Sequence, residues 1–304
     1  MGFWADWAAV VGLVVLVVVF AATSPVFLST GNIQAILLAA AIPAVLVIGQ
    51  TFVVATAGID LSMASVMTLG AVILGWTASK GWSIGVSMAA AVAVAGLVGV
   101  ANGAIIAKGK VPDFVVTLGT LSAASGLALI ISDGKPVQVT NLLLLRLATR
   151  SVGPIGYSVL VALVLAVIGH YVLFHTRFGV HLLATGGEPE SARNMGVSTD
   201  RVKIAVYTIS GVMAGVGAIL LVSRLGAAEP AANTSYLLNA VAAVVLGGVS
   251  LFGGRGTIAG PVVGAILLTT LVNGLTLLGV SQFYQPLAVG IVVVLAALLM
   301  RFQK

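Results

Sequence analysis

Long apolar runs, separated by short polar segments, follow one another along almost the whole chain. Ten of these runs approach the length of a membrane-spanning helix, at residues 7–23, 33–57, 63–79, 83–107, 114–132, 157–175, 203–223, 237–250, 257–278 and 283–300. A helix needs about 20 apolar residues to cross the hydrocarbon layer of a bilayer. The pattern therefore predicts ten helices. Pro43 falls inside the second run, and four glycines lie at the end of the eighth run or closely follow it, at Gly247, Gly248, Gly253 and Gly254.

These runs lack the strict alternation of β-barrel strands. Every backbone N–H and C=O within bilayer hydrocarbon needs a partner inside the protein, so apolar runs without alternation favour helices. The composition agrees, because 60% of the residues are hydrophobic and only 7% are charged, against roughly 25% charged residues in soluble domains. The predicted fold class is all-α, a polytopic membrane protein. Glycines four residues apart, such as Gly99/Gly103 and Gly211/Gly215, indicate closely packed helices.

A single transmembrane domain is predicted over residues 1–304. The two longest polar connections, at about 133–156 and 176–202, are too short for a separate soluble domain. The first basic residue is Lys80. The positively charged start of a secretory signal is therefore missing, and we expect residues 7–22 to remain in place as the first helix.

The fourteen Lys and Arg residues give a net charge of +6, and they are dispersed through the connections. They form no run or stripe, so nucleic acid is not an expected partner. If ten helices span the membrane and both termini are cytoplasmic, nine of these residues lie inside: Lys108, Lys110, Arg177, Arg193, Arg201, Lys203, Arg255, Arg301 and Lys304. Five lie outside: Lys80, Lys135, Arg146, Arg150 and Arg224. This bias agrees with the positive-inside rule and predicts a cytoplasmic 176–202 connection.

The most polar stretch of the chain is GGEPESARNMGVSTDRVK, residues 186–203, with three acids and three bases. Within it, residues 188–195 have acids in the first turn of a short predicted helix, which suits the helix dipole, and Gly196 is placed to end that helix. Two interpretations remain open at this point. The short helix is a docking surface for a cytoplasmic partner, or the stretch is a solvated connector.

Asp60 lies in the stretch ATAGIDLSMAS, close to apolar helices on both sides. An acid at membrane depth usually faces a cavity or a partner, which indicates a translocation pathway. Asp60 or Ser62 is also placed to cap the third helix. The two roles are compatible.

Uncharged polar residues occur within or beside several other runs. They include Gln50, Asn102, Thr117, Asn239 and Asn273. Interhelical hydrogen bonds explain any one of them. Together they also suit a polar path, because a neutral hydroxylated solute needs donors and acceptors without fixed charge.

Several kinds of chemistry are not expected in this chain. Zero Cys excludes disulfides and thiolate ligands, and the three histidines, at 170, 175 and 181, lack the HExxH spacing of a zinc site. No GxxxxGK[ST] phosphate-binding loop occurs, so ATP hydrolysis would belong to another subunit. We predict no catalytic residue, no metal site and no cofactor in this chain.

Five stretches together resemble the permease subunits of ribose-type ABC sugar importers, within the larger group that includes branched-chain amino acid permeases. They are AGIDLSMAS (57–65), VPDFVVTLGT (111–120), DGKPV (133–137), TRFGVHLLATGGEPESARNMGV (176–197) and AAVVLGGVSLFGGRGTIAGPVVGAILL (242–268). The resemblance implies a type II-like bundle in the bacterial inner membrane, paired with a second permease copy, either identical or similar. It also implies ATPase subunits that carry ATP and Mg, and an extracytoplasmic solute-binding protein.

The resemblance also implies roles for particular residues. The 176–202 connection would hold the helix that contacts the ATPase, with Gly187, Glu188, Ala192, Arg193 and Gly196 as the coupling residues. The outer connections would receive the binding protein through Arg146, Arg150, Arg224 and Glu229.

This sequence differs from the family pattern at Asp113, Leu237 and Asn239, and the last two stand where many sugar permeases have acids. The identity of the solute therefore stays open, and an amino acid ABC permease is one alternative. An ion-coupled secondary transporter is another, for which only Asp60 and Asp113 are candidate coupling acids.

Overall fold

The computed structural model describes residues 3–231 and 234–301, and this part of the chain is largely helical. Its helices are α1 (Phe3–Thr23), α2 (Thr30–Val54), α3 (Met63–Ser79), α4 (Ile84–Gly109), α5 (Asp113–Ser132), α6 (Leu142–Thr149), α7 (Tyr157–His175), α8 (Arg177–Gly187), α9 (Pro189–Asn194), α10 (Thr199–Leu225), α11 (Thr234–Leu246), α12 (Ala259–Leu277) and α13 (Gln285–Arg301). Four two-residue strands, β1 (Val137–Gln138), β2 (Ser151–Val152), β3 (Ile155–Gly156) and β4 (Ala227–Ala228), form the pairs β1–β4 and β2–β3.

A helix occupies each of the ten predicted runs. Six helices of the described chain, α2, α4, α5, α7, α10 and α12, are long and apolar enough to cross a membrane. The apolar helices α3 and α11 and the described parts of α1 and α13 are shorter. The prediction for 237–250 is wrong at its end, because α11 stops at Leu246 and Gly248 turns the chain with φ +78.

The two long polar connections contain three further helices. The sequence predicted a short helix at 188–195, and α9 confirms it. The helices α6 and α8 were not predicted. One side of α8 is buried, at Gly179, Leu182, Thr185 and Gly186, so packing against the bundle stabilises a segment that the sequence suggested was a loop.

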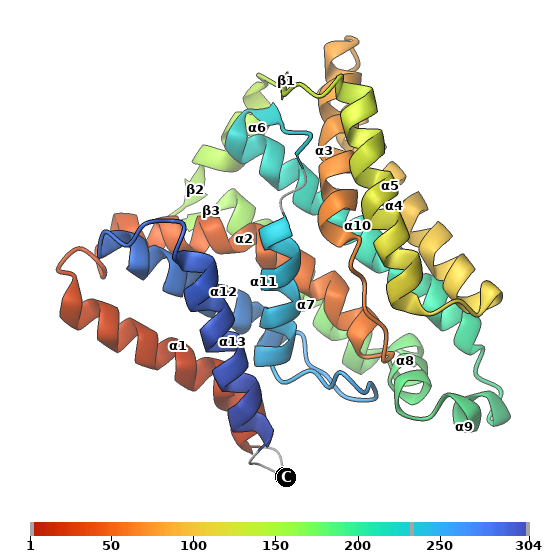
Figure 1. Ribbon diagram of the computed structural model, residues 1–304. Helices are drawn as coiled ribbons and strands as arrows, with labels where there is room; N and C mark the ends of the chain where they lie inside the picture. Colours follow the sequence, from red (N-terminus) through yellow and green to blue (C-terminus); the bar gives the residue numbers. More distant parts are fainter. Residues whose placement is uncertain (1–2, 232–233, 302–304) are drawn as a thin grey trace.

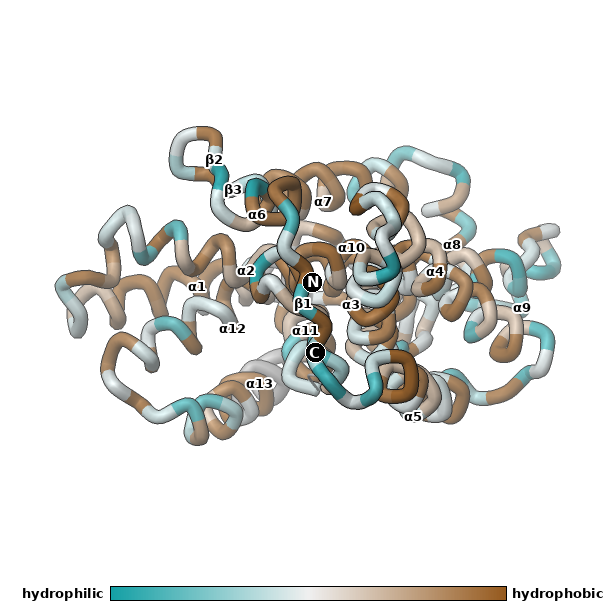
Figure 2. Tube along the Cα trace, turned by 90° about the horizontal axis from the view of Figure 1, so that it is seen from above, coloured by the Kyte–Doolittle hydropathy of each residue, from teal (hydrophilic) through white to brown (hydrophobic). Residues whose placement is uncertain are grey.

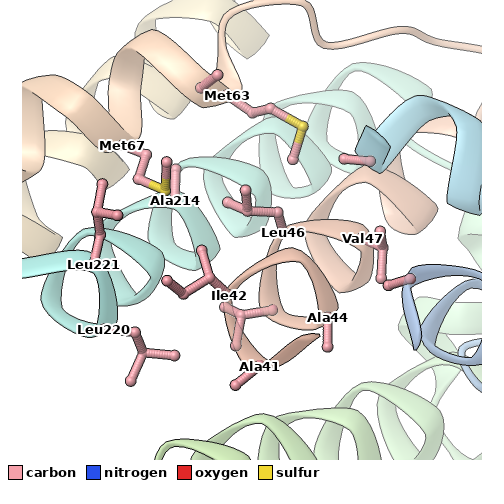
Figure 3. Close-up of a cluster of buried hydrophobic side chains, with 14 of the residues drawn as sticks. Ala41, Ile42, Ala44, Leu46, Val47, Met63, Met67, Ala214, Leu220 and Leu221 are labelled. Carbon is pink, nitrogen blue, oxygen red and sulfur yellow. The ribbon is translucent and has the colours of Figure 1, made fainter. Parts of the chain in front are cut away.

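Helix α2 lies at the centre of the bundle. Its residues from Ala40 to Val54 are all buried, and it packs against α7, α10, α11 and α12. Pro43 does not interrupt it, because one continuous helix runs from Thr30 to Val54. Figure 3 shows Ile42 and Leu46 of α2 among side chains of α3 and α10.

The closest helix pair is α4 with α10. A Cβ added at Gly99 would overlap the carbonyl oxygen of Tyr207, and one added at Gly211 would overlap that of Ala95. Glycines therefore let the two backbones approach each other, as the four-residue spacing predicted.

The two sides of the bundle carry different connections (Figure 1). The helices α8 and α9 lie in the lower part of the view, as do the described ends of the chain in α1 and α13. The strand β1 and the helix α6 lie in the upper part. Figure 2 shows hydrophobic residues along most helices and hydrophilic residues gathered near α9 and in the outlying turns.

Candidate functional site

The α8–α9 segment is an ordered projection built by local capping. The Thr176 hydroxyl accepts a hydrogen bond from the Gly179 N–H at 3.2 Å and so caps α8. Glu188 is extended, ends α8 and begins α9, where Pro189 occupies the first turn. Gly196 follows with φ +84. Ala192 is buried, whereas Gly187, Glu188, Arg193 and Gly196 are exposed.

Arg193 ties α9 to the start of α10. Its Nε donates to the Thr199 hydroxyl at 2.7 Å, and a terminal guanidinium nitrogen lies 3.6 Å from Asp200 Oδ1. Both charged side chains remain more than half exposed. The guanidinium therefore positions α9 and still presents a charge to solvent.

Two connections of the chain meet the end of α8 through main-chain atoms. The Gly254 N–H, between α11 and α12, donates to the Ala55 carbonyl at 3.0 Å, just after α2. A Cβ added at Gly186, near the end of α8, would overlap that same carbonyl oxygen. We call this contact between the α2–α3 connection, the end of α8 and the α11–α12 connection the three-way junction. Only glycine permits its close approach at residue 186.

A row of polar side chains on α10 faces the starts of α3 and α5. Lys203, Tyr207 and Ser210 follow one another at spacings of four and three, so they share one face of the helix. Lys203 Nζ lies 3.4 Å from Asp113 Oδ1, and the Tyr207 hydroxyl donates to Asp113 Oδ2 at 2.8 Å. The start of α5 is thereby fixed to α10.

Asp60 is buried and receives three hydrogen bonds. Its Oδ2 accepts from the Ser210 hydroxyl at 2.7 Å, and its Oδ1 accepts from the Ser62 N–H at 2.9 Å and the Ser62 hydroxyl at 2.6 Å. The capping hypothesis is wrong for Ser62, whose side chain makes no cap hydrogen bond to α3. Asp60 instead accepts a hydrogen bond from the backbone N–H of Ser62, the residue just before α3, so its carboxylate binds the start of this helix as predicted.

The same network extends to α4 and α5. The Asn102 amide donates to the Ser62 hydroxyl at 3.0 Å and accepts from the Thr120 hydroxyl at 2.5 Å. Thr117 lies next to the Ile59 carbonyl, with its hydroxyl 3.4 Å from that oxygen. Four of the predicted pathway residues, Asp60, Ser62, Asn102 and Thr117, are therefore gathered around the α2–α3 connection.

Two cavities adjoin these elements. A cavity of about 260 Å³ lies between α9, the α4–α5 connection and the start of α10, and is lined by charged residues that include Lys110, Asp113, Arg193, Asp200 and Lys203. A second cavity, of about 180 Å³, lies between α2, α11 and α12. Its lining is Ala39, Pro43, Ser235, Tyr236, Asn239, Leu268, Thr269 and Val272.

The remaining predicted pathway residues lie near this second cavity or along the same helices. Asn239 lines it, and Asn273 of α12 donates to Asn32 Oδ1 at 2.9 Å. Gln50 is completely buried in α2, and neither polar atom of its amide has a hydrogen-bond partner among the described residues. The predicted pathway residues thus form two groups, one around Asp60 and one along α2, α11 and α12.

The predicted docking residues Arg146, Arg150, Arg224 and Glu229 are all exposed. The pairing of β1 with β4 joins the connection after α5 to the connection after α10, and the Val139 N–H donates to the Gly226 carbonyl at 2.9 Å. The structure thus brings the two predicted docking connections together at one side of the bundle.

Sequence reasoning missed three functional candidates, Lys203, Tyr207 and Ser210. Their spacing on one face of an otherwise apolar helix was a usable signal. Their partners were not visible, because Tyr207 lies 94 residues from Asp113 and Ser210 lies 150 residues from Asp60 along the chain.

Comparison with known proteins gives a consistent set of relatives. The family model described as "Branched-chain amino acid transport system / permease component" matches residues 32–299. The ribose import permease protein of Bacillus subtilis (strain 168) is 40% identical, over 95% of this chain and 91% of the relative. The ribose import permease protein of Escherichia coli (strain K12) is 35% identical, over 95% and 92%. The D-allose transport system permease protein of the same strain is 32% identical, over 98% and 92%. Among solved structures, none matches the chain significantly.

Proposed function

Because the chain belongs to the family of branched-chain amino acid transport system permease components, we propose that it is the membrane-spanning subunit of an ATP-driven importer of a sugar or sugar-like solute. The observation that carries this proposal is the match to relatives named as ribose and D-allose permeases, which extends over nearly the full length of both chains. Import of a neutral solute also suits the uncharged lining of the cavity between α2, α11 and α12.

The chain is a multi-pass membrane protein, and the finer topology is part of the proposal. Ten spans would be formed by α1, α2, α3, α4, α5, α7, α10, α11, α12 and α13, in a type II-like bundle. Both termini and the α8–α9 segment would face the bacterial cytoplasm, in line with the positive-inside bias. The described chain ends in α1 and α13 lie on the same side of the bundle as the α8–α9 segment in Figure 1, which supports this assignment.

Helix α9 is the proposed contact for the ATPase subunits, which would carry ATP and Mg. Glu188 and Arg193 are exposed there, while Ala192 packs inward and holds the helix on the bundle. Gly187 and Gly196 flank the helix, and Gly196 allows the left-handed turn that ends it. Movement of α9 would reach the α2–α3 connection through the three-way junction and through the contact of Arg193 with Thr199 of α10.

On the opposite side, the surface that includes Arg146, Arg150, Arg224 and Glu229 is proposed to receive a solute-binding protein. A second permease copy, identical or similar, would complete the membrane part of the transporter.

We propose two separate roles for the predicted pathway residues. Those around Asp60 position the α2–α3 connection, and Gln50, Asn239 and Asn273 serve solute passage.

Ion-coupled transport is less well supported by these contacts. A coupling acid must bind and release its ion during the cycle. Asp60 is buried under three hydrogen bonds, and Asp113 is paired with Lys203 and Tyr207. Both carboxylates therefore already have structural partners.

The proposal is tested by isolating the tagged protein from its native membranes in mild detergent and identifying stoichiometric companions by mass spectrometry. We expect an ATPase to be recovered, and uptake of D-ribose or D-allose to require ATP and to be resistant to L-leucine. Purification of the chain alone, under conditions that preserve a control ABC complex, would contradict the ABC assignment. Uptake that an ionophore abolishes while ATP remains would favour the ion-coupled alternative, and competition by L-leucine would favour an amino acid permease.

A further inference from the structure

The cavity between α2, α11 and α12 is bordered by one or two turns of each of the three helices. Ala39 and Pro43 lie four residues apart on α2, and Tyr236 and Asn239 lie three apart on α11. Thr269 is contributed by α12. The volume of about 180 Å³ has room for several water molecules, and it is smaller than the roughly 300 Å³ at which pockets for drug-sized ligands begin. The cavity therefore suits a small solute.

Pro43 leaves a main-chain acceptor beside this cavity without its helical donor. A proline has no N–H, so the Ala39 carbonyl loses the donor that a regular helix would supply from four residues later. Both Ala39 and Pro43 line the cavity. Backbone groups left unpaired at membrane depth are tolerated where they face a polar cavity or find another partner.

The side chains of the lining add further hydrogen-bonding groups. Within the described chain, neither the Tyr236 hydroxyl nor the Asn239 amide makes a hydrogen bond to another residue. The Thr269 hydroxyl donates to the Ala265 carbonyl at 2.8 Å, which leaves its oxygen as an acceptor. The cavity thus presents donors and acceptors from all three helices, together with the apolar face of the Tyr236 ring.

Charge is missing from this lining. None of the described residues that border the cavity carries a charged side chain, in contrast to the cavity beside α9. A buried ammonium or carboxylate is costly without a counter-charge. Hydroxyl groups both donate and accept, so they match a mixed neutral lining of amide, phenol and carbonyl groups.

The polar groups continue along the same helices on both sides of the cavity. On α2, Asn32, Ala39, Pro43 and Gln50 are spaced by seven, four and seven residues, so they lie on one side of the helix. Asn273 lies four residues beyond Thr269 on α12. The Asn273 Oδ1 and both polar atoms of Gln50 are buried without partners among the described residues, so amide atoms without a partner lie before and after the cavity along the same line.

We propose that this cavity is a binding subsite for a neutral, polyhydroxylated solute within the permease chain, with Asn239 as its main polar contact and Gln50 and Asn273 as the next groups along the path. The inference rests on the proposed import function and adds the place and the chemistry of solute contact.

A single introduced thiol tests the subsite, because the chain contains no cysteine. Ala39→Cys places a thiol on the cavity wall and leaves the polar side chains intact. In membranes that contain the assembled transporter, a small hydrophilic methanethiosulfonate reagent should label it, as followed by mass on this chain. Protection scales as 1 + [solute]/Kd, so D-ribose at about four times its Kd should slow labelling about fivefold. D-allose is tested in parallel, and L-leucine should give no protection.

Two further variants in the Ala39→Cys background make the test specific. Asn239→Leu should abolish protection by the sugar, whereas Leu238→Ala, at an exposed residue beside it, should preserve protection. The subsite is wrong if the thiol at residue 39 resists labelling, if neither sugar slows labelling, or if protection survives Asn239→Leu. Sugar uptake measured in the same membranes separates the failures. If the sugar is taken up but does not slow labelling, only the subsite is overturned. If the sugar is neither taken up nor slows labelling, the proposed function is overturned.

Discussion

The carboxylate of Asp60 shows how a single residue is accommodated inside the bundle. Its three donors come from Ser62 and from Ser210 of α10, so the carboxylate joins the α2–α3 connection to a helix far along the chain. When a buried charged group loses such a donor, the free-energy cost of removing that group from water is no longer offset by the hydrogen bond. The hydrogen bond from Ser210 is therefore expected to matter more for stability than for local helix geometry.

We expect Ser210→Ala to destabilise the protein by about 1–3 kcal/mol, because Asp60 Oδ2 loses its donor in a buried site. Thermal unfolding in detergent measures this change. Thr208→Ala, two residues earlier, is the matched control, since the Thr208 hydroxyl only donates to the Ile204 carbonyl of its own helix. Its effect should stay within about 0.5 kcal/mol. Equal effects of the two substitutions would contradict this account.

At the residue scale, the sequence identified polar residues but not their partners. Asp60, Asn102 and Gln50 were recognisable because each is a polar residue within or beside an apolar run. Which of them would be saturated with hydrogen bonds and which left unpaired depends on helices that lie far away in sequence. Asp60 and Asn102 share one network, whereas Gln50 has no partner among the described residues.

At the element scale, the α8–α9 segment contacts the bundle through backbone at the three-way junction, through buried side chains such as Leu182 and Ala192, and through the hydrogen bond from Arg193 to α10. The sequence predicted α9 from its acids, proline and final glycine. It did not predict α8, because residues 177–187 end in two glycines and only tertiary packing of Leu182 and Gly186 stabilises them as a helix.

Gly186→Ala should destabilise the protein by about 1–3 kcal/mol and reduce uptake, because its Cβ would overlap the Ala55 carbonyl oxygen in a contact between backbones. Gly187→Ala is the control. A Cβ at residue 187 meets only the Gly254 Cα, at 3.7 Å, an ordinary contact distance. Thermal unfolding and uptake are measured for both variants. A harmful Gly187→Ala with a tolerated Gly186→Ala would reverse the expectation.

Arg193→Glu should uncouple transport from ATP hydrolysis and leave membrane insertion unchanged. Coupling free energies of about 1–3 kcal/mol correspond to a change of roughly 5–150-fold, so uptake should fall at least about fivefold. The exposed pair with Asp200 contributes only about 0–1 kcal/mol, and stability should change little. Uptake and ATPase activity of the purified complex measure the effect.

The exchange Arg193→Asp with Asp200→Arg separates the two roles of the guanidinium. It keeps an ion pair between α9 and α10 and removes the positive charge that α9 presents. Continued uncoupling is the expected outcome if Arg193 contacts the ATPase. Recovery of uptake in the exchanged protein would instead assign Arg193 to positioning α9 on α10.

At the scale of the whole molecule, the positions of the ten main helices were predictable from apolar length alone. The membrane solvates most of the surface, so each span is signalled by its own sequence. The burial of most of α3 and of one side of α11, and the meeting of their connections, depend on packing among helices and were not predictable in this way.

The sidedness of the bundle gives a further prediction. In intact cells, an impermeant thiol reagent should label Val152→Cys, at the end of β2, and should leave Ser191→Cys of α9 unlabelled. Both positions are exposed, and the chain has no other cysteine. In inverted membrane vesicles, the reagent should label Ser191→Cys and leave Val152→Cys unlabelled. Labelling of both positions from the same side would overturn the proposed topology.

The three-way junction has a consequence for how such a chain diversifies. Its contacts are made by main-chain atoms at Ala55, Gly186 and Gly254, so they persist whatever side chains the surrounding helices carry. The lining of the cavity between α2, α11 and α12 includes the side chains of Tyr236, Asn239 and Thr269, which single substitutions alter directly. Under the proposed subsite, substitutions in the cavity therefore change which solute is bound while the backbone contacts of the three-way junction stay the same. Related chains then acquire new substrates without a change in the contacts between α8 and the bundle.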